Sequence, residues 1–180
     1  MTQQTALLDT CVLINLLASG ECEAILRSSN RRWLICSVVE RESIYLRTDD
    51  PNVPLELINL EPLISSGVIS VCDVETEEES RLYVNYSSML DDGEAMSLAL
   101  ALARGHQLAT DERKAKRLFL EAVSSTDELI GTSQILREWV EGHSIEKIRA
   151  KEVLVQIANR ARFFPPSSDV YYQWWSDICR

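Results

Sequence analysis

The sequence lacks several features that would assign it to a familiar class of protein. No apolar run reaches about 18 residues, the length of a membrane-spanning helix, so we expect no membrane segment. The N-terminal residues MTQQTALLD lack the basic segment and cleavage site of an export signal, which favours a cytoplasmic protein. The five cysteines form no CxxC pair, a scatter that fits reduced thiols. Two histidines, His106 and His143, are too few and too far apart in the sequence to predict a zinc site.

Positive charge is also scarce. Lys and Arg total 18 against 28 Asp and Glu, which gives a net charge of −10 at pH 7. This balance excludes a protein that binds nucleic acid through its overall charge. It leaves room for an enzyme that holds nucleic acid through local arginines and a bound metal, and for a basic partner. The six glycines form no GxGxxG or P-loop pattern, so nucleotide binding by those routes has no support.

What the sequence does contain is an alternation of strands and helices. Short apolar runs predict strands over residues 5–8, 32–36, 67–74 and 107–110. Helical patterns predict helices over residues 10–20, 21–30, 37–47, 55–65, 76–90, 91–105, 111–123, 127–141 and 144–160. The alternation predicts a three-layer α/β/α fold, in which a central parallel sheet has helices on both faces. We expect a single domain over residues 1–180, with a helical, aromatic-rich extension from about 145 packed on it.

Four acids stand near the expected ends of strands. Asp9 and Asp111 directly follow the runs TALL and QLAT, Glu42 lies shortly after the strand that ends near Cys36, and Glu94 opens an apolar helix. Ligands of such sheets bind beyond the carboxyl ends of the strands, so we expect these acids to gather there. Clustered carboxylates repel one another unless a cation is present, and Mg²⁺ or Mn²⁺ suits oxygen ligands. Such ions activate water and stabilise the charge that develops on a phosphodiester.

Four segments carry a resemblance to a known family. LLDTCVLINLL, SVVERESIYL, DDGEAMSLALA and LATDERKAKRL resemble, in order, the four motifs of the PIN-domain family, in the branch with a Gly-Glu-Ala third motif. The resemblance covers residues 5–140. It implies a PIN-like fold and a divalent-metal-dependent endoribonuclease that hydrolyses RNA, often the VapC-type toxin of a toxin–antitoxin pair. Family members commonly form homodimers and are held inactive by an antitoxin.

The resemblance also implies roles for individual residues. By it, Asp9, Glu42, Glu94 and Asp111 are the catalytic metal ligands, and Thr10 supports Asp9. The second motif offers both Glu40 and Glu42, and the spacing from Val39 to Glu42 fits the family pattern better. Glu112 stands where many relatives have Asp or Asn, so it either assists the metal or faces solvent. The segment beyond about 145 carries no motif.

Simpler interpretations stand beside these roles. Asp9 and Asp111 are both good N-caps for a following helix. Asp91 and Glu94 have the spacing of a capping box, with Asp in place of Ser or Thr. Glu42 is equally compatible with a solvated helix residue that pairs with a nearby arginine. The basic residues after Asp111 either approach a phosphate backbone or form a solvated helix face, and the aromatic tail either stacks on bases or packs in the fold.

Two other functions are compatible with parts of the pattern. The chain is either an active nuclease or a catalytically inactive PIN-fold binding or regulatory module, and the presence of all four acids favours the nuclease. A haloacid-dehalogenase-type phosphohydrolase also begins with a strand and an Asp. That chemistry needs Asp-x-Asp, whereas Cys11 stands two residues after Asp9.

Overall fold

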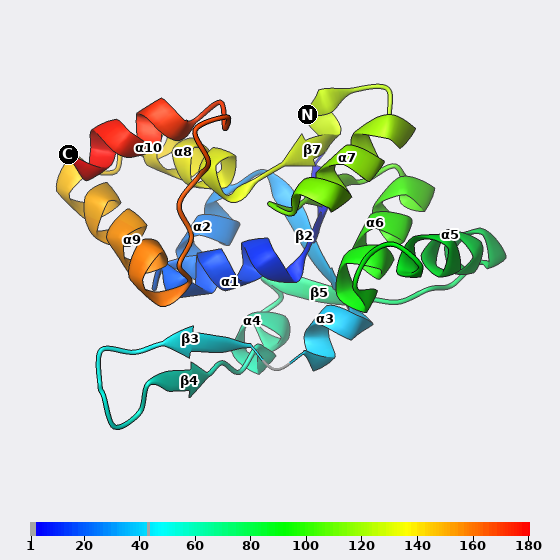
Figure 1. Cartoon of the computed structure of the whole chain (residues 1–180), viewed down its shortest axis with the longest axis horizontal. Coiled ribbons are helices and arrows are strands. Elements are labelled where there is room, and N and C mark those ends of the chain that lie inside the picture. The colour runs from blue at the N-terminus through cyan, green and yellow to red at the C-terminus, as the bar shows by residue number, and fades with distance from the viewer. Residues whose placement is uncertain (1–2, 43) are drawn as a thin grey trace. The chain divides into compact units, whose positions relative to one another are not determined.

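A computed structural model describes residues 3–42 and 44–180 of the chain (Figure 1). The chain divides into two compact units. The first unit takes in Met1–Leu13, Asn30–Glu42 and Leu60–Gly131, and the second takes in Ile14–Ser29, Ser43–Asn59 and Thr132–Arg180. All four candidate acids belong to the first unit, so the site can be described within it. That the whole chain forms one domain stays a prediction.

The first unit contains a five-stranded parallel sheet. Its strands, in spatial order, are β5 (Ile69–Cys72), β2 (Arg31–Cys36), β1 (Gln4–Leu8), β6 (Gln107–Ala109) and β7 (Leu129–Ile130). The four strands expected from the sequence are all present, and β7 joins them at one edge. This parallel sheet, flanked by helices, confirms the expected α/β/α fold class.

The central strand β1 positions the start of the site. Ala6, Leu7 and Leu8 are fully buried, as in a strand that is covered on both faces. Leu8 is paired with Ala109 of β6, and the Asp9 amide continues the ladder by donating to the Ala109 carbonyl at 3.0 Å. The carboxyl ends of these adjacent strands therefore bring the residues that follow them together.

Helices of the first unit follow the strands in the chain. They are α3 (Ser37–Arg41), α4 (Glu61–Ser65), α5 (Glu77–Ser87), α6 (Asp92–Arg104), α7 (Arg113–Ala122) and the short 3-10 helix Thr126–Glu128. The α5 and α6 helices lie side by side, and α6 contacts β1, β2 and β6 (Figure 1). Buried residues occupy most positions of α6 from Ala95 to Ala101, which confirms the expected buried helix. Gly105, with φ of 61°, ends it in the left-handed conformation that glycine favours.

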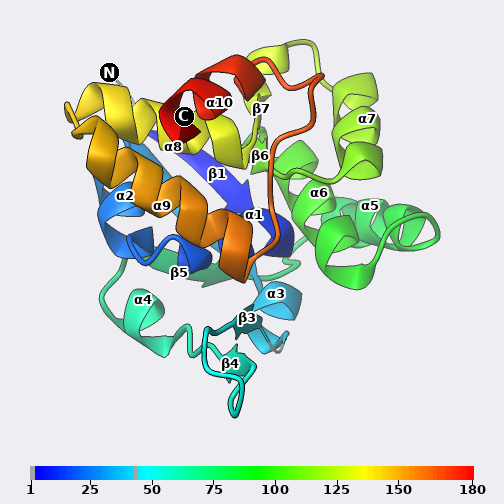
Figure 2. The same ribbon diagram turned by 60° about the vertical axis from the view of Figure 1, so that its left-hand side comes forward.

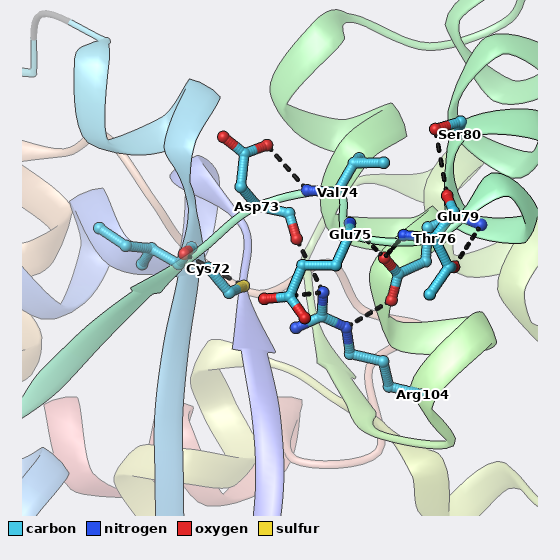
Figure 3. Close-up of polar contacts among 9 residues, drawn as sticks. Cys72, Asp73, Val74, Glu75, Thr76, Glu79, Ser80 and Arg104 are labelled. Carbon is cyan, nitrogen blue, oxygen red and sulfur yellow. Dashed lines mark hydrogen bonds and ion pairs between the residues drawn. The ribbon is translucent and has the colours of Figure 1, made fainter.

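A capping box starts α5. The Glu79 amide donates to the Thr76 hydroxyl at 3.2 Å, and the Thr76 amide donates to the Glu79 carboxylate at 3.1 Å (Figure 3). Arg104, at the end of α6, donates to the same carboxylate at 2.7 Å and to the Asp73 carbonyl at 2.7 Å. One buried carboxylate thus fixes the start of α5 to the end of α6.

The second unit joins the early and late parts of the chain. The α1 helix (Thr10–Ala18) begins in the first unit and continues into the second. The second unit further contains α2 (Cys22–Ser28), the antiparallel hairpin of β3 (Tyr45–Arg47) and β4 (Leu55–Leu57), α8 (Thr132–Gly142), α9 (Lys147–Arg160) and α10 (Tyr172–Cys179). The α9 and α10 helices pack together, and α2 packs on α8 (Figure 2). No helix of the described residues is both long and apolar enough to cross a membrane.

Three expected helices are corrected by the structure. The helix expected over 37–47 ends at Arg41 and is followed by β3, and that expected over 55–65 divides into β4 and α4. The helix expected over 127–141 begins only at Thr132, after the 3-10 turn and β7. In β3, only the central Leu46 is buried, which is the alternation of a strand. Pairing with β4 outweighs the local helical pattern there.

Candidate functional site

Asp9 is the most buried acid of the site. It follows β1 and is only 1 % exposed. Its carboxylate accepts hydrogen bonds from the Thr10 amide at 2.8 Å, the Thr110 hydroxyl at 2.7 Å and the Cys11 thiol at 3.2 Å. Burial raises the pKa of Asp9, these three bonds oppose the rise, and the charge of Asp111 adds to it. The side chain is therefore a desolvated carboxylate oriented by three donors.

The contacts of Asp9 exceed those of an N-cap. The Asp9 carbonyl accepts from the Leu13 amide at 3.0 Å, so the residue does stand at the start of α1. A capping side chain usually accepts from the second or third amide of the helix. The Asp9 carboxylate instead accepts from the adjacent Thr10 amide and from Thr110 across the sheet. Simple capping does not explain a carboxylate oriented toward β6.

Asp111 is joined to Asp9 through Cys11. The Asp111 amide donates to the Cys11 sulfur at 3.2 Å, and the Cys11 thiol donates to Asp9. Burial, with the charge of Asp9, raises the pKa of Cys11, so the thiol keeps the proton that it donates. Lys116 places its ammonium 3.4 Å from Asp111 Oδ1, and the N-cap position of α7 belongs to Glu112. The strand-end position of Asp111 is therefore tied to the Asp9 side of the site.

Glu42 is held beside the same helix start. The Thr10 hydroxyl donates to Glu42 Oε2 at 2.6 Å. Thr10 thereby links two acids, since its amide binds Asp9 and its hydroxyl binds Glu42. Glu40 and Glu42 are both exposed, and Glu40 lies within α3 whereas Glu42 follows the end of that helix. Of the two acids of the second motif, Glu42 is the one bonded to a site residue.

Glu94 lies in the first turn of α6. Burial, followed by the negative charges of Asp9 and Glu112, raises the pKa of Glu94 to about 7. The charge of Asp9 acts on Glu94, so the two carboxylates lie near enough to repel each other. Asp91 is the N-cap residue of α6, but among the described contacts its side chain caps no amide, unlike Thr76 of α5. The complete capping box suggested by the spacing is therefore not formed.

The acids are linked in pairs: Cys11 joins Asp9 to Asp111, and Thr10 joins Asp9 to Glu42. Within residues 3–42 and 44–180, no group of three or more His, Cys, Asp or Glu side chains is arranged to hold a metal ion together. The chemistry of the donors nevertheless fits a hard divalent cation, because all four groups are carboxylates and two have raised pKa values. A cation at this edge would offset both burial and mutual repulsion.

Several residues that complete the site escaped the sequence interpretation. Thr110 is fully buried, binds Asp9, and accepts from the Glu112 amide at 3.1 Å. In the sequence, Cys11 only argued against a phosphohydrolase, whereas in the structure it links Asp9 and Asp111. Gly93 and Gly131 lie against the carboxylates of Glu42 and Asp111. The one local signal for Thr110 is that a threonine flanks each strand-end Asp.

A polar cavity of about 570 Å³ opens at the opposite ends of the strands, among the first residues of β1 and β6. His106 and Arg104 are among its lining residues. Burial, followed by the charges of Arg104 and Arg32, lowers the pKa of His106. His106 directly precedes β6, at the opposite end of that strand from Asp111.

A parallel sheet with Asp9 and Asp111 at the carboxyl ends of two adjacent strands defines an α/β protein, in which this end of the strands is the usual place for a ligand. The family model described as PIN domain matches residues 5–175, so the chain belongs to the PIN-domain family. The match extends beyond the four motifs through most of the C-terminal segment. PIN domains are generally nucleases, and those nucleases usually use divalent metals. No curated protein and no solved structure matches the chain.

Proposed function

We propose that this chain is a divalent-metal-dependent endoribonuclease that hydrolyses RNA phosphodiester bonds. The observation that carries the proposal is Asp9, a 1 % exposed carboxylate with a raised pKa at the end of the central strand. Burying such a group is costly unless a compensating charge is bound. In this proposal Asp9, Glu42, Glu94 and Asp111 hold Mg²⁺ or Mn²⁺.

The side chains of the site divide the work. When bound, the cation supplies positive charge that offsets the carboxylates and stabilises the charge developing on a phosphodiester. Thr10, Cys11 and Thr110 orient the lone pairs of Asp9 by donating to its two oxygens. With no histidine in the four motifs, activation of the attacking water would fall to the bound cation together with the carboxylates.

The start of α7 supports an RNA substrate. Arg113, Lys114, Lys116 and Arg117 follow Asp111 within one to two helical turns. Lys116 already lies 3.4 Å from the Asp111 carboxylate, so its ammonium stands at the site. These local charges supply an attraction for phosphates that the net charge of −10 does not.

The proposal includes two finer features that the family resemblance implies. The nuclease would be the VapC-type toxin of a toxin–antitoxin pair, and it would form a homodimer. An acidic chain leaves room for a basic antitoxin. Light scattering of the purified chain tests the dimer: a mass of about twice 20.4 kDa supports it, and a mass of one chain contradicts it.

The activity is tested by incubating the chain with mixed RNA and with single-stranded DNA, in Mg²⁺, in Mn²⁺ and in EDTA. The proposal predicts cleavage of RNA that requires a metal ion and stops in EDTA. A well-folded chain that leaves both nucleic acids intact in either metal would favour the alternative function, a PIN-fold binding or regulatory module.

A further inference from the structure

Two glycines border the candidate site. Gly93 precedes Glu94 in the first turn of α6, and Gly131 follows β7. A Cβ atom added to Gly93 would overlap Glu42 Oε1 and lie 3.4 Å from Glu42 Cδ. A Cβ atom added to Gly131 would lie 2.8 Å from Asp111 Oδ1. Each glycine thus leaves the space in which one acid of the site sits.

Backbone conformation does not explain these glycines. Among the described residues, the glycines with positive φ are Gly20, Gly67 and Gly105, so Gly93 and Gly131 have ordinary φ values. Glycine inside a helix also costs about 1 kcal/mol relative to alanine. What distinguishes Gly93 in α6 is therefore its closeness to the Glu42 carboxylate.

We propose that Gly93 and Gly131 are positioning residues whose missing side chains fix the Glu42 and Asp111 carboxylates in the site. This inference rests on the proposed function, because it assigns the positioned groups to metal binding. Glu42 Oε2 accepts from the Thr10 hydroxyl, and Glu42 Oε1 occupies the space that Gly93 leaves open. The Asp111 amide donates to Cys11, and Asp111 Oδ1 occupies the space that Gly131 leaves open.

At Gly93, the effect of an added methyl group on the position of Glu42 can be separated from its effect on the stability of the fold. At Gly93 the atom in the way is the end of a flexible Glu side chain, so a methyl group displaces the carboxylate rather than the backbone. The fold should accept Gly93→Ala, because alanine favours the helix. The displaced carboxylate loses its place beside Thr10, and binding of a cation that needs it weakens.

The experiment compares Gly93→Ala and Gly131→Ala with Gly142→Ala in the full chain. Gly142 is a matched control, since an added Cβ there meets nothing within 4 Å and its φ is ordinary. Mn²⁺ binding by calorimetry, RNA cleavage and thermal unfolding are measured for each variant. We expect Gly93→Ala and Gly131→Ala to bind Mn²⁺ and to cleave RNA at least about tenfold less well, with Gly142→Ala unchanged in both. Gly93→Ala should unfold at or above the wild-type temperature.

A double variant shows whether the effect passes through Glu42. In a Glu42→Ala chain there is no carboxylate to displace, so Gly93→Ala should cause no further loss of Mn²⁺ binding. Equal losses with and without Glu42 would overturn the positioning role. Wild-type binding and cleavage at Gly93→Ala would also overturn it.

A crystal structure of Gly93→Ala separates this inference from the proposed function. If the wild-type chain neither binds Mn²⁺ nor cleaves RNA, the proposed function fails. The positioning of Glu42 is then decided by that structure alone. A carboxylate moved away from the Thr10 hydroxyl supports it, and a carboxylate still bonded there overturns it.

Discussion

At the scale of single residues, hydrogen-bond donors stabilise the buried Asp9 carboxylate. Asp9 has three donors, and the Thr110 hydroxyl is the nearest of them at 2.7 Å. That hydroxyl also accepts from the Glu112 amide. The fully buried Thr110 side chain therefore donates to the Asp9 carboxylate after β1 and accepts from the Glu112 amide after β6.

Removing that hydroxyl should be costly. Thr110→Val keeps the shape of the side chain but leaves the Asp9 carboxylate and the Glu112 amide without this partner. We expect a loss of about 1–3 kcal/mol in the free energy of unfolding, measured by urea denaturation at pH 7. Thr110→Ser retains the hydroxyl and should lose less. A valine variant as stable as the wild type would contradict the role given to Thr110.

The sequence reveals some residues of the site and conceals others for a physical reason. Asp9 and Asp111 are predictable because a carboxylate directly after a short apolar run marks the end of a buried strand. Thr110 and Cys11 make contacts between segments about a hundred residues apart in the chain, and Gly131 lies beside Asp111 only in the folded structure. Such contacts leave no local pattern, so only the folded structure reveals them.

At the scale of elements, the junction of α5 and α6 depends on charge. Glu79 accepts from the amides of Glu75 and Thr76 and from the guanidinium of Arg104 (Figure 3). The Arg104 hydrogen bond is the largest cause that lowers the pKa of Glu79, from 4.5 to about 2, against the opposing effect of burial. The junction is thus stabilised by the ionised form of Glu79.

This shift predicts how stability depends on pH. A carboxyl group whose pKa is lower in the folded state stabilises the fold above its unfolded pKa. The contribution of Glu79 is then complete above about pH 4.5 and is lost as the pH falls toward 2. Glu79→Gln should therefore cost about 1–2 kcal/mol at pH 7, after allowance for solvent screening, and progressively less below pH 4.5.

Chemical denaturation of both chains between pH 7 and pH 2.5 checks this expectation. Glu77→Gln is the matched control, because Glu77 is an exposed acid of the same helix turn. Its effect should be small and should change little with pH. A constant difference between Glu79→Gln and the wild type across this range would contradict the pKa shift.

Elements with a continuous apolar signal were predictable, and three short strands without one were not. The expected strand at 5–8 and the expected helix at 91–105 correspond closely to β1 and α6, because each has a continuous apolar signal. The β3, β4 and β7 strands are only two or three residues long. Their formation depends on a partner strand elsewhere in the chain, which a local window does not contain.

At the scale of the whole molecule, the family match includes most of the C-terminal segment. The PIN-domain match reaches residue 175, whereas the motifs recognised in the sequence end near 140. Trp175 of α10 is fully buried and contacts Phe163 edge to face at 5.6 Å. Trp175 is therefore part of the core of the second unit, which favours packing over base stacking for this residue.

That core predicts unequal effects for two adjacent tryptophans. Trp175→Ala should lower the free energy of unfolding by about 3–5 kcal/mol, because it leaves a large cavity. Trp174 is only partly buried, so Trp174→Ala should cost clearly less. Urea denaturation followed by circular dichroism measures both. Equal losses would mean that α10 packs differently from the structure.

The central claim is that buried Asp9 serves a metal-dependent nuclease. The most direct measurement compares RNA cleavage in Mn²⁺ by the wild type and by Asp9→Asn, with thermal unfolding of both in EDTA. We predict metal-dependent cleavage by the wild type and none by the variant. Asp9→Asn should unfold at or above the wild-type temperature, because it removes a buried charge that Asp111 and Glu94 repel. Undiminished cleavage by Asp9→Asn would contradict the claim and remove Asp9 from the site.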